Sequence, residues 1–215
     1  MTALIFNDSA ALTTGQKVAL VMPFAAQLNS AALRLNVAPT GAAATFDIES
    51  DGISLLPSVL SVAISAFAPT TAHGFQKNGT ISAAAVGTGA NADKIVYTVG
   101  AGHLFKAGDV VTVASVAVAA GGSAVPYNVT DKQVHSVTST TVTLTTYSGT
   151  PGTYASGGTM VSTTSPVVVP AGAVLSFDVD QVGSTVTGSG YTLVIDISEP
   201  ADTSKAAGGL DSSRF

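Results

Sequence analysis

Two segments that lie far apart in the chain share one pattern and constrain the fold more than any other feature. The first covers residues 33–52 (LRLNVAPTGAAATFDIESDG) and the second covers residues 169–197 (VPAGAVLSFDVDQVGSTVTGSGYTLVIDI). Both alternate apolar and polar residues, the period of a half-buried β-strand, and both place acidic residues on one strand face. The stretch between them has a different pattern of strand-like runs and turns. The sequence therefore predicts one β domain that is split by a second β domain, inserted into a loop of the first.

Strand patterns recur along the whole chain, whereas helical periodicity is almost absent. No window of about twelve residues combines apolar residues three and four apart with capping residues at its ends. Strand-like runs recur roughly every ten residues, among them 58–64 and 109–118, and clusters of Gly, Pro, Asn and Ser separate them. This spacing is typical of sandwiches and barrels, so we expect an all-β protein.

Shifts in composition predict the domain boundaries. The split domain is expected at residues 1–72 plus 164–215, and the insert at residues 73–163, between the polar stretches TTAHG and STTSP. An insertion at an exposed loop tip is tolerated because its two ends lie close together, so the insert should project from the base. The C-terminal stretch ADTSKAAGGLDSSRF is polar and aperiodic, which is typical of an extended arm or a mobile end.

Composition limits the classes of partner. Only 10% of the residues are charged, the net charge is −5, and no run of Lys or Arg exists, so nucleic acid is not an expected partner. The longest apolar stretch, residues 110–120, is too short to span a bilayer, and the N-terminus lacks the pattern of a signal peptide. We therefore expect no membrane partner. The mean hydropathy is nevertheless positive, which suggests surface that is covered by other chains.

Four carboxylates form the strongest candidate for a site. Asp47 and Glu49 share one strand face, as do Asp178 and Asp180, so all four would cluster if the two strands were neighbours. The simplest interpretation is a solvated polar face of a sheet. A cluster of oxygen ligands for Ca²⁺ is the first alternative, and a pair of carboxylates for acid–base chemistry is the second.

Sequence motifs of catalysis are absent. The three histidines, His73, His103 and His135, do not have the spacing of a zinc site, and the chain contains no Cys. No GxSxG elbow accompanies the many serines, and no Gly-rich stretch has the Lys-Ser/Thr of a phosphate loop. We therefore expect a protein that is not an enzyme and needs no cofactor.

Aromatic residues in the insert allow two interpretations. Four of the five tyrosines fall there, and the chain contains no Trp. Exposed tyrosines could stack on sugars or contact a protein, whereas buried ones would complete a small core. We favour burial. The four residues are Tyr97, Tyr127, Tyr147 and Tyr154.

The predicted base carries a resemblance to a known group of proteins. The residues that carry it are Ala38-Pro39-Thr40-Gly41, Asp47, Asp51-Gly52, Asp178-Val179-Asp180-Gln181-Val182-Gly183-Ser184 and Leu193. In this order they resemble a small β-sandwich of tailed-phage virion proteins, described as decoration, minor structural or fibre-like proteins. Members of that group typically run from the Asp-Gly turn through one more strand to the second motif. This chain departs from them by an insert of about ninety residues.

The insert is similar to a second module, which is common in tail and head appendages of phages. These modules are small immunoglobulin-like or related β folds. The residues that carry this resemblance are Ile95–Thr98, Phe105, Gly108–Val113, Tyr127–Thr130, Val137–Thr141 and Gly157-Gly158.

Together the resemblances imply a fold and a role. The fold is a jelly-roll-like β-sandwich base interrupted by a small inserted Ig-like β-sandwich or barrel. The role is that of a capsid decoration, or cement, protein on the outer capsid surface of a bacteriophage virion. The alternative is a tail or head fibre component, an adhesin that binds host-surface glycan through the insert.

The implied partners are the major capsid protein and further copies of the chain. A trimer is one closed arrangement that would hide sheet edges. The segments that we expect to reach neighbours are the apolar N-terminal strand, with Leu4, Ile5 and Phe6, and the end of the tail, with Arg214 and Phe215.

Overall fold

A computed structural model describes residues 2–69, 74–145, 147–162 and 166–200. Within these residues the chain is almost entirely antiparallel β-structure, and the only helical element is one 3-10 turn, Gly89–Asn91. The all-β prediction is confirmed. The expected boundaries, between residues 72 and 73 and between residues 163 and 164, lie outside the described residues.

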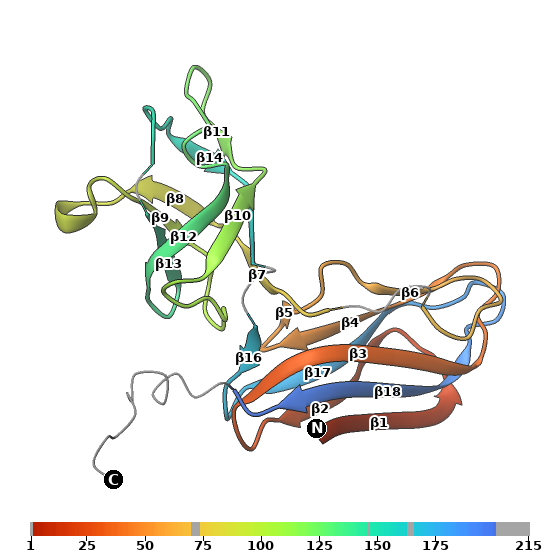
Figure 1. Ribbon diagram of the computed structural model, residues 1–215. Helices are drawn as coiled ribbons and strands as arrows, with labels where there is room; N and C mark the ends of the chain where they lie inside the picture. Colours follow the sequence, from red (N-terminus) through yellow and green to blue (C-terminus); the bar gives the residue numbers. More distant parts are fainter. Residues whose placement is uncertain (1, 70–73, 146, 163–165, 201–215) are drawn as a thin grey trace, which may run out of the picture.

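The base is a β-sandwich built from both ends of the chain (Figure 1). One sheet has the order β1-β18-β3-β16, and the other has the order β2-β17-β4-β5, with β6 beside β4. The chain crosses from sheet to sheet at almost every connection, which is the jelly-roll arrangement. The strands are β1 (Thr2–Ala11), β2 (Gly15–Val21), β3 (Ala26–Val37), β4 (Ala44–Ser50), β5 (Ile53–Ser54), β6 (Leu60–Val62), β16 (Val167–Val169), β17 (Val174–Gln181) and β18 (Ser189–Ser198).

The two segments with a shared pattern do lie side by side. Strand β3 pairs with β18, where Leu33 stands opposite Leu193, and β4 pairs with β17, where Asp47 stands opposite Asp178. The insert occupies the chain between them without interrupting either pairing. The prediction of one sandwich split by an insertion is therefore confirmed at the level of strand pairing.

Strand alternation fills the space between the two sheets. Phe46 and Ile48 of β4 and Phe177 of β17 are at most 2% exposed and face inward, opposite to the acidic residues with which they alternate. The ring of Phe177 stacks on Phe46, with 5.5 Å between centroids, and lies 5.0 Å from the ring of Tyr191 in the opposite sheet. The contact between Phe177 and Tyr191 joins the two sheets.

Two of the motifs that carry the phage resemblance, residues 38–41 and residues 183–184, meet at one end of the sandwich. Thr40 forms a β-bridge with Val186, and a Cβ atom on Gly183 would overlap the carbonyl oxygen of Val186. Gly41 has a φ of +80°, and a Cβ atom there would collide with the side chains of Ser184 and Thr185. The two glycines therefore allow two loops to pack at a distance that no larger residue permits.

The insert is one curled, seven-stranded sheet with its own core. Its order is β7-β15-β10-β12-β13-β9-β8, and a small sheet of β11 and β14 lies beside β8 (Figure 1). The curled form matches the barrel alternative rather than two facing sheets. The strands are β7 (Lys77–Thr80), β8 (Ala83–Val86), β9 (Ile95–Thr98), β10 (Val110–Ala114), β11 (Ala117–Val118), β12 (Val129–Val137), β13 (Thr141–Leu144), β14 (Tyr154–Ser156) and β15 (Thr159–Ser162).

Candidate functional site

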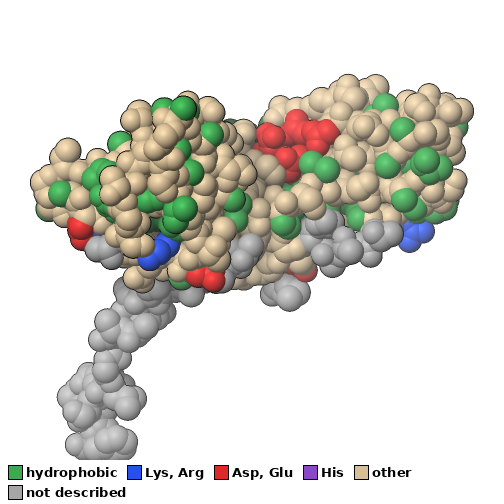
Figure 2. All heavy atoms as spheres, turned by 90° about the horizontal axis from the view of Figure 1, so that it is seen from above, with side chains coloured by type: hydrophobic (Ala, Val, Ile, Leu, Met, Phe, Trp, Pro, Cys, Tyr) green, Lys and Arg blue, Asp and Glu red, His purple; other side chains and the backbone are tan. Residues whose placement is uncertain are grey.

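The four predicted carboxylates lie on the outer face of one sheet of the base. Asp47 of β4 stands opposite Asp178 of β17, and Glu49 and Asp180 follow on the same two strands. Figure 2 shows acidic side chains gathered as one red group on the base, beside the insert. The structure therefore brings these residues together.

Burial and mutual repulsion set the charge of this cluster. Asp47 is only 8% exposed, and its Oδ1 accepts hydrogen bonds from Ile48 N at 2.7 Å and Ser54 Oγ at 2.8 Å. Burial raises the pKa of Asp47, and the nearby carboxylates of Asp180 and Asp178 raise it further. The pKa values of Glu49 and Asp180 are raised for the same two reasons. The cluster consequently favours proton uptake.

The arrangement of the cluster fits a polar sheet face better than a metal centre. Asp178 Oδ2 accepts a hydrogen bond from Ser176 Oγ at 3.0 Å, so its contacts are local. Across the described part of the chain, no group of three or more His, Asp or Glu side chains is arranged to hold a metal ion.

The cluster predicts a pH-dependent gain in stability when one charge is removed. Asp178→Asn should raise the free energy of unfolding at pH 7 by about 0.5 kcal/mol, because it removes a like charge opposite Asp47. Carboxyls whose pKa is raised by folding bind protons more tightly when folded. Their repulsion is therefore lost as the pH falls through the raised folded pKa towards the unfolded value near 4, and the gain should vanish there.

Urea unfolding at a series of pH values measures this effect. Asp131→Asn is the matched control, because Asp131 is exposed in the insert and its φ of 51° suits Asn equally well. If the free energy of unfolding of Asp178→Asn at neutral pH is equal to or lower than that of the wild type, the carboxylates do not repel one another as we infer. Calcium that stabilises the wild type and not this variant would identify a cation site.

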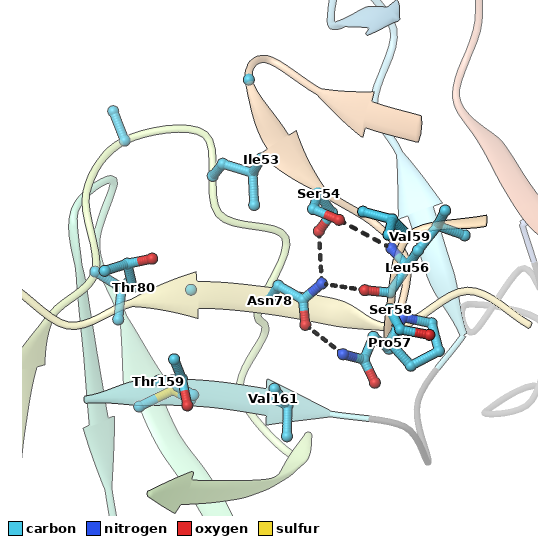
Figure 3. Close-up of a pocket in the computed structure, with 16 residues that line it drawn as sticks. Ile53, Ser54, Leu56, Pro57, Ser58, Val59, Asn78, Thr80, Thr159 and Val161 are labelled. Atoms are coloured by element: carbon cyan, nitrogen blue, oxygen red, sulfur yellow. Dashed lines mark hydrogen bonds between the residues drawn. The ribbon is translucent and has the colours of Figure 1, made fainter. Parts of the chain in front are cut away.

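A groove lies where the base meets the insert (Figure 3). Its volume is about 560 Å³, and β5, the loop after it, β7 and β15 line it. Asn78 of β7 bridges the two parts, since its Nδ2 donates to Ser54 O at 2.7 Å and to Leu56 O at 3.0 Å. Gln76 N also donates to Leu55 O at 2.8 Å. These bonds join an edge strand of the insert to the edge of the base.

The chemistry of this groove is neutral. Its polar side chains are hydroxyls and carboxamides, such as Ser54, Asn78 and Thr80, and aliphatic residues such as Met160 complete it. No acidic, basic, histidine or aromatic side chain is among the lining residues. The described lining residues thus include neither a side chain that titrates near neutral pH nor a ring on which a sugar could stack.

The tyrosines of the insert serve mainly in packing. Tyr97 and Tyr127 are at most 3% exposed. Tyr97 donates its hydroxyl hydrogen to Tyr127 O at 2.8 Å, and Tyr127 donates to Gly152 O at 2.7 Å. Tyr154 and Tyr147 are partly buried against the same core. The interpretation that favoured burial over an exposed sugar-binding face agrees with these positions.

The two described histidines, His103 and His135, do not form a site together. His103 is partly buried, which lowers its pKa, and its Nε2 lies 3.0 Å from Thr138 O. His135 is exposed on β12. His73 lies outside the described residues.

The N-terminal residues expected to reach neighbours belong to an edge strand. Leu4 and Phe6 of β1 pack against the core but remain half-buried, and Ile5 on the opposite face is 65% exposed. Strand β1 pairs with β18 on one side only. Arg214 and Phe215 lie outside the described residues.

An exposed apolar patch at one end of the base was missed by the sequence analysis. Val37 ends β3, and Val186 sits in the loop bridged to Thr40. Backbone hydrogen bonds bring the loop after β6 to the same place, from Ser65 N to Pro39 O at 2.9 Å and from Leu35 N to Phe67 O at 2.7 Å. Figure 2 shows hydrophobic side chains on this end of the base, away from the insert. We call Val37, Ile64, Phe67 and Val186, each 43–52% exposed, the end patch.

No family model, curated protein or solved structure matches the chain. The resemblance to phage virion proteins therefore rests on the sequence motifs alone. In the part of the chain that the structure covers, no helix is long and apolar enough to cross a membrane.

Proposed function

We propose that this chain is a capsid decoration protein of a tailed phage, which binds the outer shell through its base and stabilises it by bridging coat subunits. The observation that carries the proposal is the opposite placement of the insert and the end patch on the base. One end of a rigid sandwich would contact the major capsid protein, and the insert would project outward.

Strand directions support this placement. The insert leaves the base near β5 and returns at β16, which pairs with the beginning of β3, at Ala26–Leu28. The end patch includes Val37, at the other end of β3. A strand of 12 residues spans roughly 35–40 Å, so the two features are separated by the length of the sandwich.

The mechanism would be cementing by burial of apolar surface. Burial contributes roughly 25 cal/mol per Å² of apolar area before the costs of association. An exposed apolar patch rimmed by polar residues is typical of an interaction surface. Repetition of one modest contact at many equivalent sites would then stabilise a whole shell.

The proposal predicts that charge in the end patch weakens binding to particles. Phe67→Lys and Ile64→Lys should each reduce the affinity for particles assembled without this protein by at least about tenfold, which is about 1.4 kcal/mol. A lysine there would have to be desolvated against the shell without a partner. Co-sedimentation of purified protein with the particles measures the affinity.

Val125→Lys is the matched control, because Val125 is 73% exposed and lies in the insert. It should bind as the wild type does. Equal binding by the wild type and by both end-patch variants, all with unchanged melting temperatures, would reject attachment through this end.

The alternative function, a fibre or adhesin component that binds glycan through the insert, has less support. Tyr97 and Tyr127 are buried in the core of the insert, and no aromatic side chain is among the described residues that line the groove. A glycan array with the full chain would reveal binding if the alternative holds.

A further inference from the structure

Most sheet edges of the described base are protected against pairing with another chain. Strand β5 has two residues, and β16 has three residues with a proline on each side. Strand β2 is longer but carries Lys17 and ends shortly before Pro23. Short length, charge and proline are the usual means by which proteins protect such edges.

Strand β1 is neither short nor interrupted by proline, and it is the least protected of these edges. It has ten residues, Thr2–Ala11, contains no proline or basic residue, and carries a single charge, Asp8. Its other edge pairs with β18 in a register that runs without a shift from Thr2 to Asp8. The free edge thus presents a straight row of backbone donors and acceptors to solvent.

The side of the sandwich along β1 is also open. Leu4 and Phe6 of β1 and Val18 and Leu20 of β2 pack against the core from its margin, and all four are only half-buried. The two strands belong to different sheets, so their side chains line the seam between the sheets. This seam leaves apolar surface uncovered beside an unprotected strand edge.

We propose that β1 pairs with β1 of a second copy of this chain, antiparallel and about a two-fold axis at Ile5. In this register Ile5 faces the partner's Ile5, and Leu4 faces the partner's Phe6. Thr2 faces the partner's Asp8, and Ala3 faces the partner's Asn7. The two four-stranded sheets would become one continuous sheet.

The sequence of β1 is self-complementary in this register. Leu4 and the partner's Phe6 meet twice by symmetry, on the face that borders the seam, and cover it in both copies. Thr2 brings a hydroxyl donor to the carboxylate of the partner's Asp8, and no like charges stand opposite each other. Aromatic–aliphatic pairs and matched polar pairs are the contacts that stabilise neighbouring strands.

A second copy fits the edge better than the C-terminal segment of the chain itself. Residues 201–215 follow the end of β18, which lies beside the start of β1, and they are long enough to reach the edge. Their only large apolar residues are Leu210 and Phe215, five positions apart, so a strand would place them on opposite faces. As a strand, they would therefore not cover Leu4 and Phe6 together.

The two-fold contact closes with two copies and does not depend on the proposed function. The same surface is used on both subunits, so no unpaired β1 edge is left to recruit a third. This differs from the three-fold arrangement considered from the sequence. In a virion, such a dimer would carry two end patches and thereby contact two coat subunits.

Charge exchange at Ile5 tests the pairing. We expect the full-length chain to be a dimer by sedimentation equilibrium. Ile5→Lys and Ile5→Glu should each weaken dimerisation at least about tenfold, because each places like charges opposite one another. An equimolar mixture of the two variants should restore dimers. Val125→Lys, at an exposed position of the insert, should leave the wild-type dimer unchanged.

A cysteine at the same position provides a second readout. The chain contains no Cys, so Ile5→Cys introduces a single thiol. Opposite residues of antiparallel strands have Cβ atoms about 4.5–5.5 Å apart, and mild oxidation should therefore give a covalent dimer. Val125→Cys should remain monomeric on a denaturing gel.

Several outcomes would overturn the proposal. They are a wild-type chain that stays monomeric or forms trimers, dimers that survive Ile5→Lys, and a mixture of the two charged variants that fails to associate. A chain truncated after Pro200 that dimerises where the full chain does not would identify the tail as the occupant of the edge.

Discussion

Asp109→Asn is expected to lower the free energy of unfolding of the insert by about 3–5 kcal/mol. Lys77 Nζ of β7 lies 2.7 Å from Asp109 Oδ2, and the two side chains are 3% and 9% exposed. The same carboxylate oxygen accepts a hydrogen bond from Lys106 N at 2.8 Å. An amide keeps the shape of the side chain but leaves the charge of Lys77 buried without a partner, and this accounts for the large loss.

Urea unfolding together with hydrogen exchange of the β7 and β10 amides measures the effect. The double variant Lys77→Met with Asp109→Asn should recover most of the loss, because it removes both buried charges. Asp93→Asn is a second control. Asp93 pairs with Lys94 at an exposed position, and its loss should change little. Wild-type stability in Asp109→Asn would show that the buried pair does not hold the insert together.

Phe177→Ala should destabilise the base by about 3–5 kcal/mol, the usual cost of deleting a buried aromatic ring. Phe177 is 2% exposed and contacts Phe46 within its own sheet and Tyr191 in the facing sheet. Removing the ring leaves a cavity at the only described contact between aromatic rings of the two sheets. The loss should appear as a lower urea midpoint.

Two variants calibrate this result. Phe177→Leu retains much of the volume and should cost less than half as much as Phe177→Ala. Phe24→Ala removes a ring that is 51% exposed and should have little effect on the urea midpoint. A loss below about 1 kcal/mol for Phe177→Ala would mean that this contact is not central to the core.

Side-chain alternation makes the sandwich predictable. Phe46 and Ile48 point inward and Asp47 and Glu49 point to the other face, because successive residues of a strand face opposite sides. The same rule places Phe177 and Asp178. Since both segments share one pattern, their pairing across the insert follows from the alternation of their residues.

Strand ends are less predictable, because backbone pairing rather than side-chain pattern sets them. The pattern of residues 58–64 predicts a strand over the whole run, but only Leu60–Val62 form one, where they face Ala44–Phe46. Residues 109–118 divide into β10 and β11, because Ser115 between them has a φ of 63°. Such a conformation breaks a strand and leaves no signal in an apolar run.

Contacts between distant loops are not predictable at all. The end patch gathers residues from two loops and the end of β3, and no local pattern links Val37, Phe67 and Val186. The hydrogen bond from Asn78 Nδ2 to Ser54 O likewise has no sequence pattern that would predict it. By contrast, the clustering of the four carboxylates can be predicted from side-chain alternation once β4 and β17 are known to pair.

Cryo-electron microscopy of the intact particle that encodes this chain tests the central proposal most directly. The proposal predicts density for the base on the icosahedral shell, between coat subunits, with the Ile64 and Phe67 end towards the shell and the insert outward. Density for this chain only on the tail or at a vertex would contradict a decoration role and would favour the fibre alternative.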